Sequence, residues 1–165
     1  MASRIRQAAV IIIISGVLAT VFNSLSSQSI PLRGSWPSMA GSDSIIVPPS
    51  AAEGDPPFIS LDEAAAKFQS KETIFLDARE PEDYSSGHIR AAINLPFERL
   101  DEYWGKVVDS LPKSGEIVTY CSGDECESSL FLGRELVARG YNKILVFYGG
   151  WREWEKARLP IEKLN

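Results

Sequence analysis

The sequence predicts an α/β domain with a central parallel sheet and helices on both faces. Apolar, β-rich runs over residues 73–76, 116–120 and 143–147 predict buried strands. These runs lack alternation of apolar and polar residues, which indicates burial on both faces. Segments with helical character separate them, and alternating strands and helices are typical of a parallel sheet.

Composition restricts the classes of function. The chain has 165 residues and a net charge of −5, which argues against nucleic acid as a partner. Its two cysteines, Cys121 and Cys126, are too few to staple a fold together. With a single histidine they are also too few for a usual structural zinc site of four ligands. We therefore expect neither a metal nor a cofactor.

The N-terminal segment, residues 1–25, predicts a membrane anchor or a signal segment. Arg4 and Arg6 precede an apolar run over residues 8–22. A spanning helix needs about 20 apolar residues, which the run reaches if residues 23–25 are counted. A cleaved secretory signal has a basic start and an apolar core of about 7–15 residues, which also fits. A core or amphipathic helix is the third alternative, although the run has no polar face.

Charge around this segment predicts its orientation. The arginines lie before the apolar run, and only Arg33 follows soon after it, which places the N-terminus inside the cell. We expect a single-pass anchor that contacts the membrane through residues 8–25, with the remaining chain on the periplasmic or extracellular side.

Residues 26–57 are rich in serine, proline and glycine and predict a linker with little regular structure. Apolar islands at residues 30–32 and 45–47 either pack on the domain or lie at the membrane surface. The folded domain is expected over residues 58–165.

Its first elements follow from local signals. Ser60 and Glu63 form a capping box that begins a helix through Phe68. The strand over residues 73–76 ends at Asp77, and Pro81 begins a helical turn. The later elements are expected to be a loop over 87–89, a strand over 92–95, a helix over 97–108, a strand over 116–120, a helix over 128–139 ended by Gly140, a strand over 143–147, a turn at 149–150 and a helix over 151–157.

Cys121 is the strongest candidate for chemistry. It follows a predicted buried strand and precedes a polar loop and a helix. Free N–H groups and the positive end of the helix dipole at such a place lower a cysteine pKa and favour the reactive thiolate. Ligands of parallel sheets bind at the carboxyl ends of the strands, where Asp77 also lies, so the two residues are expected to converge.

Four stretches resemble the rhodanese (sulfurtransferase) domain. They are Asp-Ala-Arg-Glu at 77–80 with the following Pro-Glu-Asp-Tyr, Gly-His-Ile to Ile-Asn-Leu-Pro at 87–96, Val-Thr-Tyr-Cys at 118–121, and Gly-Tyr at 140–141 through Gly-Gly-Trp at 149–151. The resemblance covers residues 58–162. With the N-terminal anchor and the Cys-Ser-Gly-x-x-Cys-Glu loop, the chain resembles a membrane-tethered bacterial subgroup of that family.

The resemblance implies a role for each matching residue. Cys121 matches the persulfide-forming cysteine, and the loop backbone at residues 122–125 (Ser122, Gly123, Asp124 and Glu125) would ring the bound sulfur. Asp77 and Arg79 match an acidic and basic pair behind the site, while Glu80 and His88 match positions that hold loops in place. Cys126 lies outside the common pattern. It is either a resolving thiol that forms a disulfide with Cys121 or a helix-start residue of no consequence.

The loop departs from the family in its charge. Gly123 is the second rather than the third residue after the cysteine, and Asp124, Glu125 and Glu127 bring negative charge without an arginine. Such a loop opposes lowering of the Cys121 pKa and suits a dianion such as thiosulfate poorly. A neutral or less charged sulfane donor is therefore expected.

Three functions are compatible with these residues. The first is a sulfurtransferase of the thiosulfate or persulfide type, with a small sulfur-containing donor, a thiol acceptor and a membrane-protein partner as candidate partners. The second is a non-catalytic or redox-sensing binding module that uses Cys121 and Cys126 as a thiol/disulfide pair. The third is phosphatase-like or arsenate-reducing chemistry, which the missing loop arginine disfavours.

Overall fold

The computed structural model describes residues 44–123 and 125–164, together with positions 6, 7, 14, 15, 18 and 22. Contacts divide the chain into two units, Met1–Ser38 and Met39–Asn165. Among the described residues, no helix has both the length and the apolar character needed to cross a membrane. Apart from positions 6, 7, 14, 15, 18 and 22, the predicted anchor over residues 1–25 lies outside the described residues. Residues 26–43 of the predicted linker also lie outside them.

The second unit is built on a parallel sheet, as predicted. In the described part of this unit four strands lie in the order β3 (Ile93–Asn94), β1 (Thr73–Asp77), β4 (Glu116–Tyr120) and β5 (Ile144–Phe147). All neighbours are parallel, so their carboxyl ends meet at one edge. The helices are α2 (Leu61–Ser70), α3 (Pro81–Ser86), α4 (Leu100–Val107), α5 (Ser128–Ala138) and α6 (Gly150–Lys156), with 3₁₀ helices η1 (Phe97–Arg99) and η2 (Val108–Ser110).

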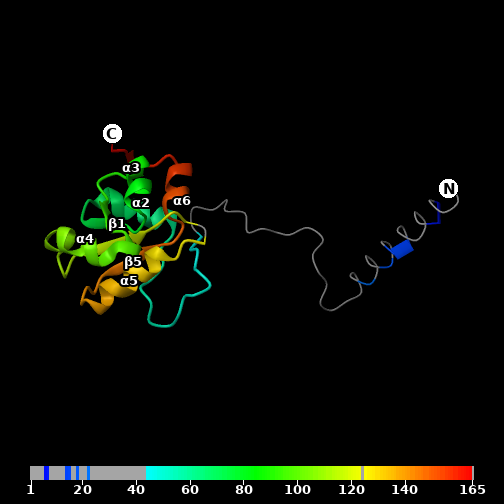
Figure 1. Ribbon diagram of the computed structural model, residues 1–165, viewed down its shortest axis with the longest axis horizontal. Coiled ribbons are helices and arrows are strands. Elements are labelled where there is room, and N and C mark those ends of the chain that lie inside the picture. Colours follow the sequence, from blue (N-terminus) through cyan, green and yellow to red (C-terminus); the bar gives the residue numbers. More distant parts are fainter. Residues whose placement is uncertain are drawn as a thin grey trace. The chain divides into compact units, whose positions relative to one another are not determined.

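Helices cover both faces of this sheet (Figure 1). On one face Phe75 and Phe147 pack with Trp154 of α6, and residues of α2 complete that core. On the opposite face Leu76 packs with Leu132 of α5, and residues of α4 complete the second core. Successive strand residues point to opposite faces, so two cores fix the sheet and hold its strand ends in place.

Two predicted elements differ from the structure. The helix expected over residues 97–108 begins as the 3₁₀ turn η1, and α4 starts only after Arg99, whose backbone is not helical. The loop expected over residues 87–89 contains a short strand, β2 (His88–Ile89), which pairs antiparallel with β6 (Ile161–Glu162). Two-residue strands carry no periodic pattern, and the partner is far away in the sequence, so neither strand was predicted.

Residues 44–57 pack on the domain, although the sequence predicted a linker through residue 57. Ile46 packs against a small core that includes Tyr148. The Val146 N–H donates a hydrogen bond to the Pro57 carbonyl at 2.9 Å. Of the alternatives for the apolar island at residues 45–47, the structure thus shows packing on the domain for Ile46, while Ile45 remains exposed.

An ion pair between Arg134 and Asp55 holds residues 44–57 against the domain, and its contribution to stability depends on pH. Arg134 Nε and Nη2 donate to the Asp55 carboxylate at 2.6 and 2.8 Å, and the Ala52 N–H donates at 2.7 Å. These bonds lower the pKa of Asp55 from 3.8 to about 2. Because the pKa is lower in the folded chain, the stabilisation is present above about pH 4 and lost as the pH falls toward about 2.

We therefore expect Asp55→Asn to weaken the loss of stability between about pH 4 and about pH 2. The measurement is the urea midpoint of unfolding across that range. Asp101→Asn is the matched control because the Asp101 side chain is fully exposed and its 3.9 Å ion pair with Arg139 is screened by water, so this variant should keep the wild-type profile. An unchanged profile in Asp55→Asn would contradict the assignment.

Candidate active site

Cys121 lies directly after β4, at the edge where the parallel strands end. It is fully buried. Its carbonyl oxygen accepts a hydrogen bond from the Trp151 N–H at 2.8 Å, and the Ser122 carbonyl accepts one from the Arg152 N–H at 3.1 Å. The first turn of α6 therefore holds the beginning of the cysteine loop through the backbone.

Glycines allow this contact. Gly123 has a φ of 85°, and a Cβ there would overlap the Gly149 carbonyl oxygen. Gly150 has a φ of 60°, and a Cβ there would overlap the Cys121 carbonyl oxygen. Both positions combine a left-handed backbone with close approach of another backbone segment, which requires glycine. The sequence predicted only a turn at residues 149–150. The glycine pair after an apolar strand was the signal for a close backbone contact.

The loop then curls so that the two cysteines meet. Cys121 and Cys126 form a disulfide, with their Cα atoms 6.3 Å apart. Glu125 has a positive φ of 25°, which turns the chain back toward Cys121. The Cys121 sulfur also lies 2.8 Å from the Cys126 carbonyl oxygen. Cys126 is half-buried, so the pair is more accessible from its side.

Acidic side chains border the loop, as the sequence indicates. Glu125 is exposed, and Glu127 accepts a hydrogen bond from the Ser50 hydroxyl at 2.6 Å. Asp124 lies outside the described residues. A pocket of about 760 Å³ adjoins the loop, lined by Ile46, Val47, Pro49, Glu125, Glu127, Tyr148 and Arg152. Two carboxylates, of Glu125 and Glu127, and one cationic side chain, of Arg152, thus line a pocket beside the cysteine loop.

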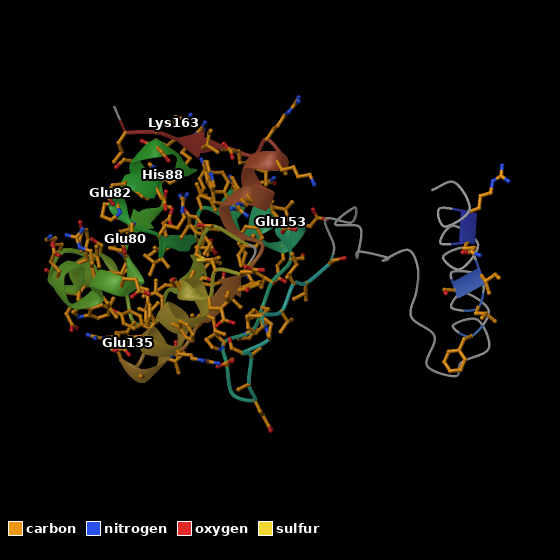
Figure 2. All side chains as sticks on the ribbon, turned by 45° about the vertical axis from the view of Figure 1, so that its right-hand side comes forward. Glu80, Glu82, His88, Glu135, Glu153 and Lys163 are labelled. Carbon is orange, nitrogen blue, oxygen red and sulfur yellow. A yellow bond between two sulfur atoms is a disulfide. The ribbon has the colours of Figure 1, made fainter. Side chains whose placement is uncertain are left out.

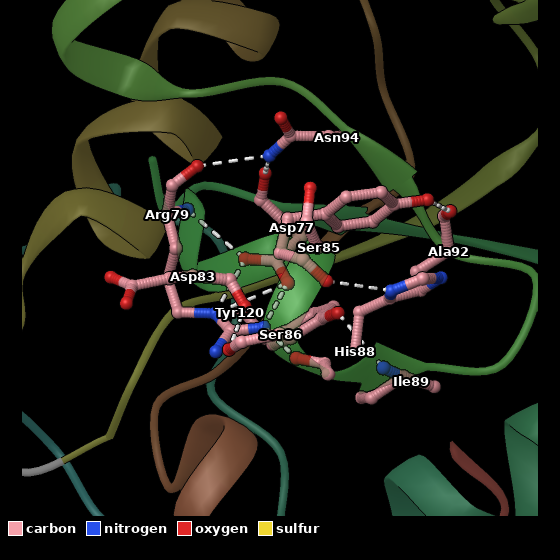
Figure 3. Close-up of polar contacts among 12 residues, drawn as sticks. Asp77, Arg79, Asp83, Ser85, Ser86, His88, Ile89, Ala92, Asn94 and Tyr120 are labelled. Carbon is pink, nitrogen blue, oxygen red and sulfur yellow. Dashed lines mark hydrogen bonds and ion pairs between the residues drawn. The ribbon is translucent and has the colours of Figure 1, made fainter. Parts of the chain in front are cut away.

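Asp77 and Arg79 form a buried ion pair at the end of β1 (Figure 3). Arg79 Nε lies 2.9 Å from Asp77 Oδ1, and Arg79 Nη2 lies 2.6 Å from Asp77 Oδ2. Nη2 also donates to the Gly87 carbonyl at 2.8 Å, and the guanidinium lies 5.0 Å from the Trp151 ring centre. Burial lowers the pKa of Arg79, but the hydrogen bonds and charge of Asp77 outweigh it, so the net shift is upward.

Tyr120 connects this ion pair to β4. Its hydroxyl accepts a hydrogen bond from the Ile89 N–H at 3.1 Å and lies within the electrostatic influence of Asp77. Burial, with the negative charge of Asp77, raises the pKa of Tyr120 well above its usual value. The hydroxyl therefore stays neutral and acts as a fixed hydrogen-bonding group. Sequence reasoning missed this residue because a tyrosine in an apolar strand carries no distinguishing pattern.

His88 and Glu80 lie at the ends of α3 (Figure 2). The His88 ring is buried, stacks on Tyr84 at 3.8 Å and places Nδ1 2.8 Å from the Tyr84 carbonyl. The Glu80 carbonyl accepts the Tyr84 N–H at 3.1 Å. The structure therefore groups the predicted residues into two sets. One set is the cysteine loop, and the other consists of the Asp77–Arg79 pair at the end of β1 with Glu80 and His88 at the two ends of α3. Within the described ranges, no cluster of three or more histidine, cysteine or acidic residues is arranged to hold a metal ion.

Fold and site define a parallel α/β domain that presents a cysteine at the carboxyl end of a central strand. The family model for the rhodanese-like domain matches residues 60–157. The chain belongs to the rhodanese-like family.

Individual relatives match part of the chain. A tRNA uridine(34) hydroxylase from Onion yellows phytoplasma (strain OY-M) is 34% identical over 97 residues, which are 56% of this chain and 30% of that protein. The senescence-associated protein DIN1 of Raphanus sativus is 29% identical over 96 residues, which are 53% of this chain and 51% of that protein. The chain therefore spans about a third to a half of the length of these relatives.

Solved structures give the same fold. The rhodanese-like domain of the Alr3790 protein from Anabaena sp. is 27% identical, with a TM-score of 0.50, and the match covers 62% of this chain and 76% of that one. The thiosulfate sulfurtransferase of Pseudomonas aeruginosa is 20% identical, with a TM-score of 0.55, over 67% of this chain and 21% of that one. At that identity the second likeness establishes the fold alone.

The glycine contact predicts a difference between two substitutions. Gly140 also has a positive φ, of 88°, but its Cβ position is open. We expect Gly140→Ala to lower the free energy of unfolding by about 1–2 kcal/mol, the cost of a left-handed residue with a side chain. Gly123→Ala adds overlap with Gly149, so it should cost more and reduce the fraction of chains with the Cys121–Cys126 disulfide. Urea unfolding and mass spectrometry after thiol alkylation measure both effects, and equal results for the two variants would contradict the contact.

The buried ion pair predicts a second stability effect. Asp77→Asn leaves the Arg79 charge buried without a counter-charge, so the free energy of unfolding should fall by about 3–5 kcal/mol. The double variant Asp77→Asn/Arg79→Met removes both charges and should lose less than the single variant. Urea unfolding of both variants is the measurement. A larger loss in the double variant would show that packing of the arginine, rather than its charge, dominates.

Proposed function

We propose that the protein is a rhodanese-like sulfurtransferase that carries sulfane sulfur on Cys121. The observation that supports this best is the place of Cys121, after a central parallel strand and in a loop fixed by the backbone of α6. This is the position at which the family resemblance implies a persulfide. The buried network behind the loop gives the nucleophile a rigid support.

In the proposed reaction the Cys121 thiolate attacks the outer sulfur of a donor persulfide. The donor leaves as a thiolate, and Cys121 carries an –S–SH group. An acceptor thiolate then attacks the outer sulfur of that group, takes it as a new persulfide and releases the Cys121 thiolate. A thiolate is the attacking species in both steps. Each step transfers one sulfur atom without net oxidation or reduction.

Charge around the loop selects the donor. Glu125 and Glu127 outnumber Arg152 among the charged residues that line the adjoining pocket, so the net charge there disfavours a donor with two negative charges. We therefore propose a polysulfide or a low-molecular-weight persulfide rather than thiosulfate. An RNA substrate, which the name of the tRNA uridine(34) hydroxylase relatives suggests for those proteins, fits poorly with a net charge of −5.

Location is part of the proposal. An anchor through residues 8–25, with two arginines before it, would hold the domain at the outer face of the membrane. The described side chains of Ile14, Leu18 and Phe22 in this segment are exposed, which suits contact with lipid. A membrane protein that delivers sulfur is a partner compatible with this location.

A second function is favoured by the disulfide. If the Cys121–Cys126 bond persists during the protein's work, the domain is a redox-sensing or binding module without turnover. Resistance of the bond to mild dithiol reduction would support that alternative. Ready reduction would restore the Cys121 thiolate and support sulfur transfer.

The test is the intact mass of the full-length chain, pre-reduced and in mild detergent, after incubation with a sulfane donor. We expect glutathione persulfide or polysulfide to react with Cys121 of the wild-type protein, seen either as one added sulfur or as loss of the free thiols, and Cys121→Ser to show neither change. Thiosulfate should load the protein poorly. Free cysteines are alkylated before the measurement. The mass then separates a chain that carries an added sulfur from a chain whose two thiols have formed a disulfide. If no donor modifies the wild-type protein in either its sulfur content or its thiols, sulfur transfer is wrong.

A further inference from the structure

Cys126 lies close enough to Cys121 to react with a sulfur atom bound there. The two Cα atoms are 6.3 Å apart, which is within the usual range for a disulfide. The bond closes a loop of few residues, so it needs a specific backbone path. Left-handed residues at Gly123 and Glu125 supply that path, and backbone hydrogen bonds to α6 hold its Cys121 end.

The backbone angle of Glu125 indicates that the surrounding structure holds the loop in its closed conformation. A non-glycine residue with a positive φ is uncommon and costs free energy, so it persists where the surrounding structure imposes it. The exposed Glu125 side chain does not impose it. The two constraints that flank it are the close approach of Gly123 to Gly149 and the Cys121–Cys126 bond.

The position of the Cys126 carbonyl group disfavours a persulfide on Cys121. Its oxygen lies 2.8 Å from the Cys121 sulfur. A persulfide anion held at Cys121 needs N–H donors around it, and a carbonyl oxygen at this distance would repel it. The observed loop therefore suits a state after sulfur has left, rather than a state that holds it.

The different burial of the two cysteines indicates which sulfur of the disulfide a reducing thiolate attacks. Cys121 is fully buried and Cys126 is half-buried. A reducing thiolate from solution reaches the Cys126 sulfur more easily. Attack on that sulfur releases Cys121 as the thiolate, which is the form needed to accept the next sulfur.

We propose that Cys126 is a resolving thiol, so that the protein reduces sulfane sulfur to hydrosulfide in addition to transferring it. This proposal rests on the proposed function of Cys121. The Cys126 thiolate attacks the inner sulfur of the Cys121 persulfide, the S–S bond to the outer sulfur breaks, and HS⁻ leaves with the bonding pair. The Cys121–Cys126 disulfide is the product.

The reaction balances with a dithiol as the reductant. One persulfide R–S–SH and the two protein thiols give R–SH, H₂S and the protein disulfide. A dithiol then reduces the disulfide through a mixed disulfide on Cys126 and is itself oxidised to a disulfide. Glu125 and Glu127 outnumber Arg152 around the adjoining pocket, and this net negative charge favours departure of the anionic HS⁻.

The test is a single turnover of the full-length chain, pre-reduced, freed of reductant and kept anaerobic in mild detergent. One equivalent of glutathione persulfide is the donor, because its transfer to Cys121 releases glutathione and no sulfide. We expect the wild-type protein to release one hydrosulfide per chain and to lose both alkylatable thiols. Cys126→Ser should instead retain one added sulfur, and its hydrosulfide release should fall to the background given by Cys121→Ser. Cys126→Ala repeats the measurement with a different side chain, and urea unfolding verifies that both variants are folded.

Other outcomes separate this proposal from the function on which it rests. Wild-type protein that keeps the added sulfur with Cys126 still alkylatable overturns the resolving role and leaves sulfur transfer intact. Equal hydrosulfide release by wild type and Cys126→Ser also overturns it, because an external thiol would then be the reductant. Failure of every variant to take up or release sulfur above the Cys121→Ser background overturns both proposals.

Discussion

Close backbone contact between the cysteine loop and the start of α6 is the constraint on which the site depends. Gly123 and Gly150 let the two segments approach without side chains between them, and the N–H groups of Trp151 and Arg152 bind the loop carbonyls. Because these bonds involve only the backbone, the loop's side chains remain available for chemistry. The loop can therefore carry an unusual set of acidic residues and still place Cys121 reproducibly at the end of β4.

Behind the loop, a second network supports the strand ends. Asp77 and Arg79 are buried as a pair, and Tyr120 joins them to the strand that precedes Cys121. The ring of Trp151 lies against the Arg79 guanidinium, so the same residue contacts both networks. Trp151 thereby connects the ion pair to the cysteine loop through one ring contact and one backbone hydrogen bond.

The sequence predicted the parts of this architecture that rest on local patterns. Apolar runs identified β1, β4 and β5, and the Ser60 cap, whose hydroxyl accepts the Glu63 N–H, marked the start of α2. The short strands β2 and β6 escaped because their pairing is a long-range contact between two-residue segments. For the cysteines, spacing allowed a bond but could not show it, since closure depends on the backbone angles of Gly123 and Glu125. Proline-rich composition likewise concealed the packing of residues 44–57.

That packing has a consequence for the sheet as an aggregation surface. β5 is the last strand in the order of the described sheet, so its outer side would offer unpaired backbone groups to another chain. The segment around Phe58 covers it: the Val146 N–H binds the Pro57 carbonyl, and the Val146 carbonyl accepts the Ile59 N–H, both at 2.9 Å. A fragment cut at residue 58 would lose part of this cover together with the contact of Ile46 on Tyr148. The segment that leads into the domain thus shields a strand edge that would otherwise be open to pairing with another copy of the chain.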